Sequence, residues 1–147
     1  IVLFEPEIPH NTGNIIRLCA NTGFILHLIK PLGFRLEDKY LRRAGLDHCD
    51  LARIKTYLTL YECLKNTKPS DVFAFTSKGQ RQLYNTNFPE RPWLIFGKET
   101  KGLPPKFLCS LEDSRLLRIP VLPNSRCLNL SNAVAIASYE VIRQINF

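Results

Sequence analysis

The stretch "RCLNLSNAVAIASYE" (residues 126–140) joins a polar half to an apolar half. Its first half contains Arg126, Asn129, Ser131 and Asn132, and nearly every residue after Asn132 is apolar. A buried polar group without a hydrogen-bond partner costs roughly 1–3 kcal/mol. We therefore expect the polar half to be a loop whose side chains find partners where a helix over 131–146 begins.

That final helix is apolar on nearly all sides, and such a helix is buried on more than one side. In a chain of 147 residues a partner subunit is the natural second cover, and the small side chains permit close helix–helix approach. We expect a homodimer whose interface includes Ala137.

Outside this segment, short apolar runs alternate with helix-like stretches. The apolar runs are typical of strands that are buried on both faces of a parallel sheet. Their alternation with helices predicts an α/β fold, a mostly parallel sheet flanked by helices, in one domain over residues 1–147. The expected strands are 1–4, 25–29, 71–75, 93–96 and 115–119, with a shorter one near 52–55, and the expected helices are 13–22, 36–45, 58–66, 104–112 and 131–146.

Composition narrows the class of protein. The chain is 45% hydrophobic and 22% charged, as in soluble globular proteins, and has no apolar run long enough for a membrane span. Its charge of +7 favours an anionic partner, nucleic acid first. The odd number of cysteines without a C-x-x-C pair indicates thiols buried in a reducing cytoplasm and no metal site. These cysteines are Cys19, Cys49, Cys63, Cys109 and Cys127.

Polar loops follow four of the expected strands, at 5–14, 76–79, 97–105 and 120–132. Ligands of open α/β sheets bind outside the carboxyl ends of the strands. We therefore expect the four loops to converge on one site.

The first loop leads into a helix for which Asn11 or Thr12 could be the cap. Arg17 then lies about one and a half turns into that helix, among apolar residues. Its guanidinium either forms a structural salt bridge or contacts phosphate or ribose close to the cap.

The third loop, "GKETKGLPP", has Gly97 and Gly102 five residues apart. It fits neither the phosphate-binding P-loop nor the dinucleotide-binding glycine pattern. Glycine at these positions allows close backbone approach to a ligand. Glu99 either holds the loop or contacts a substrate.

A basic stripe is expected on the helix over 36–45 and just before it. It is either a solvated face or a surface that contacts RNA. Its members are Arg35, Lys39, Arg42 and Arg43.

The loops together resemble the three motifs of the SpoU class of the SPOUT RNA methyltransferases. Asn11, followed six residues later by Arg17, is similar to motif one; "FGKETKGLP" is similar to motif two, and "IPVLPNSRCLNLSNAVAIASYE" to motif three. The similarity extends through "PEIPHNTGNIIRLCANTG" and "RRAGLDH" and is greatest to the small, single-domain TrmL/YibK group.

The resemblance implies a C-terminal deep trefoil knot and a homodimer that binds S-adenosylmethionine. It also implies methyl transfer to a ribose 2′-oxygen at the wobble nucleotide of tRNA, either a cytidine or a modified uridine. The 2′-hydroxyl distinguishes RNA from DNA. No metal is required for this chemistry.

By resemblance, Arg17 orients or deprotonates the ribose hydroxyl or stabilises developing charge; Asn11 holds that arginine or the nucleotide, and Asn129 lines the same pocket. Glu99 braces the loop after the fourth strand, Arg126 contacts RNA and Tyr139 lies in the dimer helix. Cys127 replaces the serine usual in motif three, which puts a side-chain hydroxyl contact in doubt. The cofactor residues implied are Phe75, Thr76, Ser77, Gly97, Glu99, Gly102, Ile119, Cys127 and Leu128.

Two other functions fit the residues. One is an RNA-binding SPOUT homologue with impaired catalysis, which the Cys127 substitution makes conceivable. The other is an unrelated α/β nucleotide-binding enzyme, for which "PHNTGN" is a poor phosphate loop.

Overall fold

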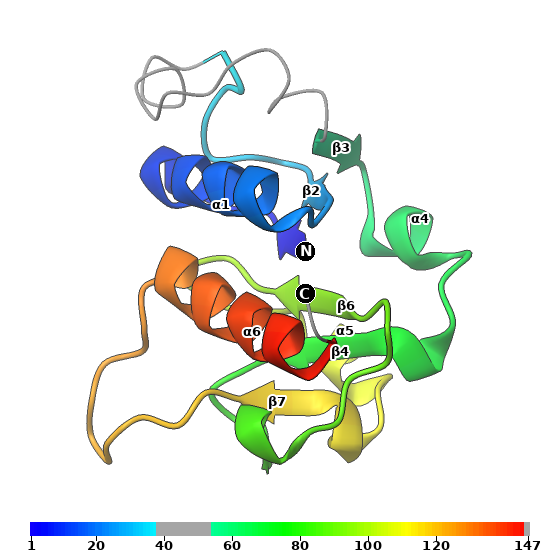
Figure 1. Ribbon diagram of the computed structural model, residues 1–147. Helices are drawn as coiled ribbons and strands as arrows, with labels where there is room; N and C mark the ends of the chain where they lie inside the picture. Colours follow the sequence, from blue (N-terminus) through cyan, green and yellow to red (C-terminus); the bar gives the residue numbers. More distant parts are fainter. Residues whose placement is uncertain (38–53, 146–147) are drawn as a thin grey trace.

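The computed structural model describes residues 1–37 and 54–145 (Figure 1). Seven strands form one sheet in the order β3-β2-β1-β6-β4-β7-β5, and all neighbouring strands are parallel. The predicted α/β architecture is thereby confirmed. The strands are β1 (Val2–Phe4), β2 (Leu26–Ile29), β3 (Ile54–Tyr57), β4 (Val72–Phe75), β5 (Arg81–Gln82), β6 (Trp93–Phe96) and β7 (Leu116–Arg118).

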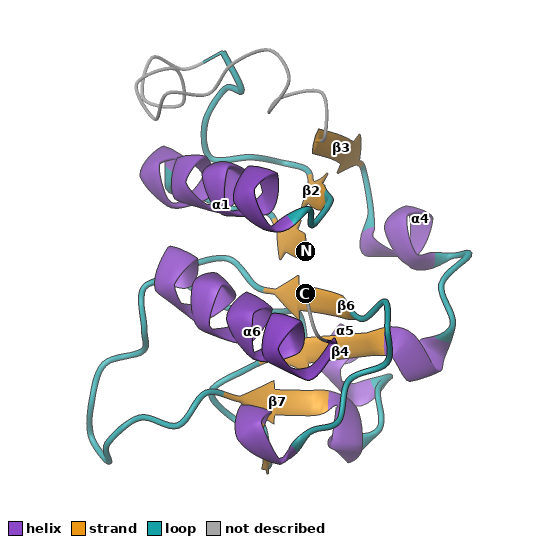
Figure 2. Ribbon diagram, in the orientation of Figure 1, coloured by secondary structure: helices purple, strands orange, loops and turns teal. Residues whose placement is uncertain are grey.

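Helices cover both faces of this sheet (Figure 2). On one face α1 (Pro9–Thr22) and α6 (Leu130–Ile145) lie side by side and pack against each other. On the other face lie α4 (Leu60–Leu64) and α5 (Pro105–Cys109). Three short 3-10 turns complete the described elements, at Pro69–Asp71, Leu83–Asn85 and Asp113–Arg115.

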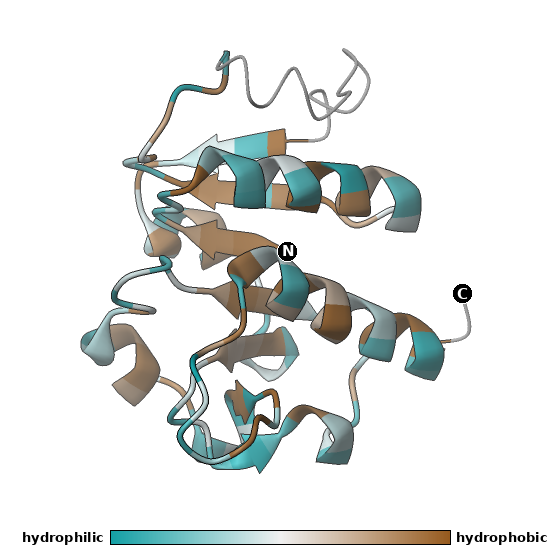
Figure 3. Ribbon diagram, turned by 90° about the vertical axis from the view of Figure 1, so that its left-hand side faces the viewer, coloured by the Kyte–Doolittle hydropathy of each residue, from teal (hydrophilic) through white to brown (hydrophobic). Residues whose placement is uncertain are grey.

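Alternate strand residues supply the two halves of the core. Leu3, Phe73 and Phe96 pack beneath α1 and α6, whereas Val2 and Ile95 pack beneath α4 and α5. Because both faces are covered, the central strands are apolar along their whole length (Figure 3). This explains why they are short apolar runs in the sequence rather than alternating patterns.

Several boundaries differ from the expected ones. The first helix begins at Pro9 instead of residue 13, and α5 ends at Cys109 instead of residue 112. β3 spans Ile54–Tyr57 rather than 52–55, and β5, which has two residues, was not predicted. The helix expected over 36–45 lies outside the described residues except for its first two positions.

None of the helices in the described ranges has the length and apolarity needed to cross a lipid bilayer. The same ranges contain no group of three His, Cys, Asp or Glu side chains placed to bind a metal. Cys19 and Cys63 are buried as expected, whereas Cys109 and Cys127 are exposed, so the expectation is wrong for those two. Cys49 lies outside the described residues. The trefoil knot stays a prediction.

Candidate active site

The carboxylate of Glu99, which follows β6, binds the segment that leads into α1. Its Oε2 accepts a hydrogen bond from the backbone N–H of Glu7 at 2.8 Å. Its Oε1 accepts from the N–H of Ile8 at 3.2 Å and from Nδ2 of Asn11 at 3.0 Å. Negative charge is favourable at a helix N-terminus. Glu99 therefore caps α1 from a distant loop.

The prediction that Asn11 or Thr12 caps this helix is wrong. Ile8 is the N-cap residue, and its side chain makes no capping hydrogen bond. Pro9 occupies the first position of the helix, where proline's missing N–H costs nothing. Asn11 lies in the first turn with only 4% of its surface exposed, and there it bonds to other loops.

Asn129, directly before α6, extends this set of hydrogen bonds to a second helix. Its Nδ2 donates to Oδ1 of Asn11 at 2.9 Å. Its Oδ1 accepts from the backbone N–H of Ser131 at 2.9 Å and from the Ser131 hydroxyl at 2.7 Å, which caps α6. One chain of hydrogen bonds thus joins three of the four loops that were expected to converge, those that follow β1, β6 and β7.

A reciprocal contact strengthens this connection. Thr100 donates its backbone N–H to Oε2 of Glu7 at 2.9 Å, and its hydroxyl lies 3.0 and 2.9 Å from the two carboxylate oxygens. The backbone hydrogen bond from Thr100 is the main reason that the pKa of Glu7 is lowered. We call the side chains of Glu7, Asn11, Glu99 and Asn129 the junction.

The sequence did not identify Glu7 or Thr100 as part of the site. The available signal was an acidic residue just before a helix. A second missed contact is the ion pair between Lys98 and Glu5, which also joins the loop after β6 to the loop after β1. Glu99 was expected to brace the loop after β4, but its hydrogen bonds go to residues 7–11.

Gly97 and Gly102 are required by the fold of their own loop. A Cβ at Gly97 would lie 2.1 Å from the carbonyl carbon of Gly102. Gly102 has φ +68°, and its N–H donates to the carbonyl of Lys98 at 2.9 Å. Close approach to a ligand is therefore not needed to explain these glycines, and their contact with a cofactor stays a prediction.

The loop after β4 is anchored to β7. The backbone N–H of Thr76 donates to the carbonyl of Leu117 at 2.9 Å, and a Cβ at Gly79 would lie 2.6 Å from the carbonyl carbon of Leu117. Just before this loop, the buried ring of Phe75 stacks on Phe96 with ring centres 4.5 Å apart. Ser77 is exposed.

Three of the four junction residues are buried or half-buried, whereas the loop after β7, which ends at the junction residue Asn129, is exposed. Ile119 is half-buried, but every residue from 120 to 129 is exposed. Val121 is 49% exposed, Leu122 78% and Leu128 37%. These exposed apolar side chains are available to a ligand or to another chain.

Arg17 lies on the solvent side of α1, on the same helix face as Asn14 and Asn21. Within the described ranges no hydrogen bond or ion pair reaches its guanidinium, so a structural salt bridge is not what the fold uses it for. It is the ninth residue of α1 (9 to 17), more than two turns from the start rather than close to the cap.

The prediction that Asn11 holds Arg17 is wrong. Residues six apart on an α-helix point roughly 120° away from each other. The Asn11 side chain is instead engaged with Glu99 and Asn129. A contact of Asn11 with the nucleotide stays a prediction.

Residues 1–139 match the SpoU rRNA methylase family. The chain belongs to that family. A tRNA (cytidine(34)-2′-O)-methyltransferase from Saccharophagus degradans is 50% identical to the chain. The match covers 100% of this chain and 96% of the relative.

Solved structures of other SPOUT methyltransferases share the fold. One described as giving insight into the 2-OH methylation of C/U34 on tRNA superposes with a TM-score of 0.89, at 40% identity, over 99% of this chain and 94% of that one. The SpoU methyltransferase AviRb from Streptomyces viridochromogenes, in complex with AdoMet, has a TM-score of 0.81 at 22% identity, over 97% and 56%. At that identity AviRb supports the fold alone.

The remaining predicted site residues are exposed or lie outside the described residues. Arg35 and Arg126 are exposed, as RNA contacts require. Lys39, Arg42 and Arg43 lie outside the described residues. Cys127, at the position of the usual motif-three serine, is exposed and bonds to no other described group.

The two interface residues predicted on α6 differ in their surroundings. Tyr139 is 57% exposed and available to a partner. Ala137 has no exposed surface because it lies in the core between α6 and the sheet. Its assignment to the dimer interface is therefore wrong.

Proposed function

We propose that this protein transfers a methyl group from S-adenosylmethionine to the ribose 2′-oxygen of the wobble nucleotide of tRNA, a cytidine or a modified uridine. The junction carries the proposal, because it brings the three SpoU motifs together through side-chain hydrogen bonds. The Saccharophagus relative, of which the match covers 96%, supports the choice of nucleotide.

The residues fit the proposed cofactor. S-adenosylmethionine supplies a methyl group on a sulfonium sulfur, together with an aromatic base, a ribose and a charged amino-acid end. The loops after β4, β6 and β7 offer hydroxyls, turn backbone and exposed apolar side chains at neighbouring strand ends. The residues that would hold it are Phe75, Thr76, Ser77, Gly97, Glu99, Gly102, Ile119, Cys127 and Leu128.

Arg17 would act on the RNA. A guanidinium stays protonated in proteins, so binding phosphate or stabilising charge on the ribose oxygen suits it better than accepting a proton. The exposed guanidinium has no described partner to displace. The side-chain amides of Asn11 and Asn129, which are hydrogen-bonded to each other, would form the rigid surface against which the ribose binds. Such positioning contributes several kcal/mol to catalysis, about 7–11 kcal/mol in the best cases.

A homodimer is part of the proposal, with Tyr139 in its interface. Tyr139→Arg should convert the dimer to a monomer in sedimentation velocity. Tyr84→Arg is the matched control, because Tyr84 is 55% exposed on a different element. An unchanged sedimentation coefficient in Tyr139→Arg would remove Tyr139 from the interface.

The function is tested with tRNA from cells that lack this protein. We expect the protein to act on cytoplasmic tRNA. When that tRNA is incubated with the purified protein and a radiolabelled methyl donor, label should appear at the wobble ribose, as mapped by nuclease digestion. Binding of cofactor and tRNA without transfer would instead establish the catalytically impaired homologue. Label at another position would contradict the choice of nucleotide.

A further inference from the structure

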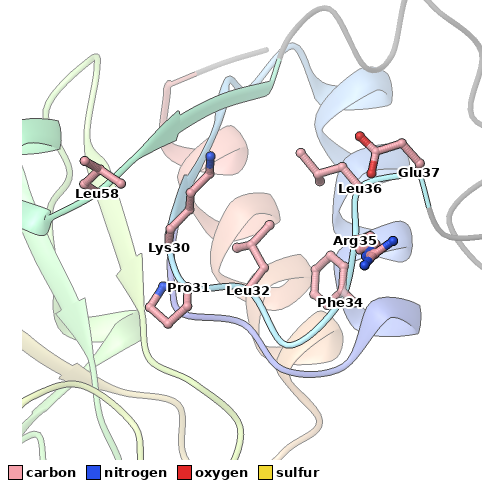
Figure 4. Close-up of a pocket in the computed structure, with 8 residues that line it drawn as sticks. All are labelled: Lys30, Pro31, Leu32, Phe34, Arg35, Leu36, Glu37 and Leu58. Carbon is pink, nitrogen blue, oxygen red and sulfur yellow. The ribbon is translucent and has the colours of Figure 1, made fainter.

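A cavity of about 580 Å³ lies beside the loop that follows β2 (Figure 4). Its walls are formed by residues 30–37, except Gly33, and by Leu58 directly after β3. In Figure 4 the Lys30 side chain extends from the end of β2, and the Arg35 side chain lies on the opposite arm of the loop. Arg35 of the predicted basic stripe lines it, but no described residue of the three SpoU motifs does.

The lining combines an apolar surface with two cations. Leu32, Phe34 and Leu36 are half-buried against the core, and Leu58 is 73% exposed. Lys30 and Arg35 are exposed, and within the described residues no acidic side chain pairs with either of them. Among the described residues that line the cavity, Glu37 is the single carboxylate.

This combination matches an unpaired nucleotide. Proteins bind single-stranded RNA by stacking bases on aromatic rings and by placing lysine or arginine near the phosphates. The net charge of +7 favours the same class of ligand. Phe34 is the aromatic ring among the lining residues.

The cavity also adjoins the candidate active site. The N–H of Gly33 donates to the carbonyl of Pro6 at 2.9 Å, and a Cβ at Gly33 would lie 2.6 Å from the carbonyl oxygen of Glu7. The loop that forms the cavity therefore packs directly on the segment held by Glu99. Since β2 runs parallel to β1, the loops that follow the two strands leave the sheet at the same edge.

We propose that this cavity holds an unpaired nucleotide of the RNA substrate, next to the nucleotide that is methylated, with its base on Phe34 and its phosphates near Lys30 and Arg35. This inference rests on the proposed function. The loop after β2 would then recognise the nucleotides that flank the methylated one, by their sequence or by their shape.

The test of the base contact uses an anticodon stem-loop RNA in which each loop nucleotide in turn is 2-aminopurine. At one flanking position, the 2-aminopurine fluorescence should fall about 3-fold or more on binding, because the base stacks on the ring. This decrease should disappear in Phe34→Leu. The variant keeps an apolar side chain, and its melting temperature is measured to show that it folds. Equal quenching in both proteins at every position would overturn the proposal.

The test of the phosphate contact compares two double variants. Lys30→Ala/Arg35→Ala should raise the KM for tRNA about 10-fold and flatten its salt dependence, with kcat and cofactor affinity nearly unchanged. Lys68→Ala/Arg91→Ala removes one exposed lysine and one exposed arginine elsewhere and is the control. Equal KM values in the two double variants would overturn the proposal.

The outcomes separate this inference from the proposed function. The inference alone fails under three conditions together. The unaltered protein methylates the wobble ribose, Phe34→Leu quenches the fluorescence as the unaltered protein does, and the Lys30/Arg35 variant has the same KM as its control. If the unaltered protein binds cofactor and methylates no tRNA, the proposed function fails first, and the cavity proposal fails with it.

Discussion

The junction and the loop over 120–128 belong to the same candidate site, yet they are built in opposite ways. In the junction, Glu7, Asn11, Glu99 and Asn129 bond to one another or to nearby backbone without any ligand. The loop over 120–128 is exposed throughout. The difference separates side chains that position the site from side chains that remain free to bind.

The same distinction applies along α1. Asn11 is buried and bonded on both sides, whereas Arg17 is exposed and unpaired within the described part of the chain. Substitutions of bonded residues should therefore change stability, and substitutions of unbonded residues should change binding or turnover.

The largest effect is expected for Arg17→Ala. Methyl transfer should fall about 100-fold or more, the range seen when a group acting on the reacting atoms is removed. The free energy of unfolding should change by less than about 0.5 kcal/mol, because the side chain is exposed and bonds to no group in the described part of the chain. Single-turnover transfer and urea unfolding measure the two quantities.

Asn21→Ala, on the same exposed face of α1, is the control for this variant. It should leave transfer nearly unchanged. Full turnover in Arg17→Ala, or a loss of stability that accounts for the lost turnover, would contradict the assignment of Arg17 to catalysis.

The next largest effect is expected for Glu99→Gln. The substitution places an NH₂ group opposite the donors Glu7 N–H, Ile8 N–H or Asn11 Nδ2 and removes the charge at the start of α1. Hydrogen bonds to charged groups are worth about 1.5–3 kcal/mol each, and part of this is recovered by the remaining oxygen. We expect a loss of about 2 kcal/mol in denaturant unfolding.

Glu90→Gln is the matched control, because Glu90 is exposed and has no described partner. A Glu99→Gln protein as stable as this control would show that the junction is not held by the carboxylate.

Acid should weaken the junction through Glu7. The pKa of Glu7 is lowered in the fold, chiefly by the hydrogen bond from the Thr100 backbone. Its contribution is therefore present above the ordinary glutamate pKa of 4.5 and is lost as the pH falls through the lower folded value. Unfolding midpoints measured from pH 6 to about pH 3 should decline less in Glu7→Gln than in the unaltered protein.

The smallest effect on stability is expected for Cys127→Ser. The thiol is exposed, so the free energy of unfolding should change by less than about 0.5 kcal/mol. A hydroxyl is a better hydrogen-bond donor than a thiol, so cofactor affinity measured by calorimetry should stay equal or increase. Weaker binding would show that the thiol itself serves the site.

Much of this arrangement could be predicted from the sequence. Apolar runs gave the strands of the sheet because both of its faces are covered. The motif resemblance placed Asn11 and Asn129 in one pocket, although they lie 118 positions apart, but it assigned Glu99 to the loop after β4. Arg17 was placed on the correct helix, but at the wrong distance from its start.

Other features could not be predicted because they depend on packing between distant residues. The acceptor that caps α1 is Glu99, and no local pattern in residues 8–12 reveals it. The burial of Ala137 depends on which side of α6 faces the sheet, and a helix apolar on nearly all sides leaves that undecided. The reciprocal Glu7–Thr100 contact joins residues 93 positions apart.

Hydrogen–deuterium exchange with and without S-adenosylmethionine tests the central claim most directly. The amides of Glu7, Ile8, Thr100 and Ser131 are already bonded, so they should exchange slowly in both samples, while the amides of 120–128 should exchange fast alone and slow with the cofactor. Fast exchange of the four bonded amides without cofactor, or protection that bypasses 120–128, would contradict a preformed junction beside an open binding loop.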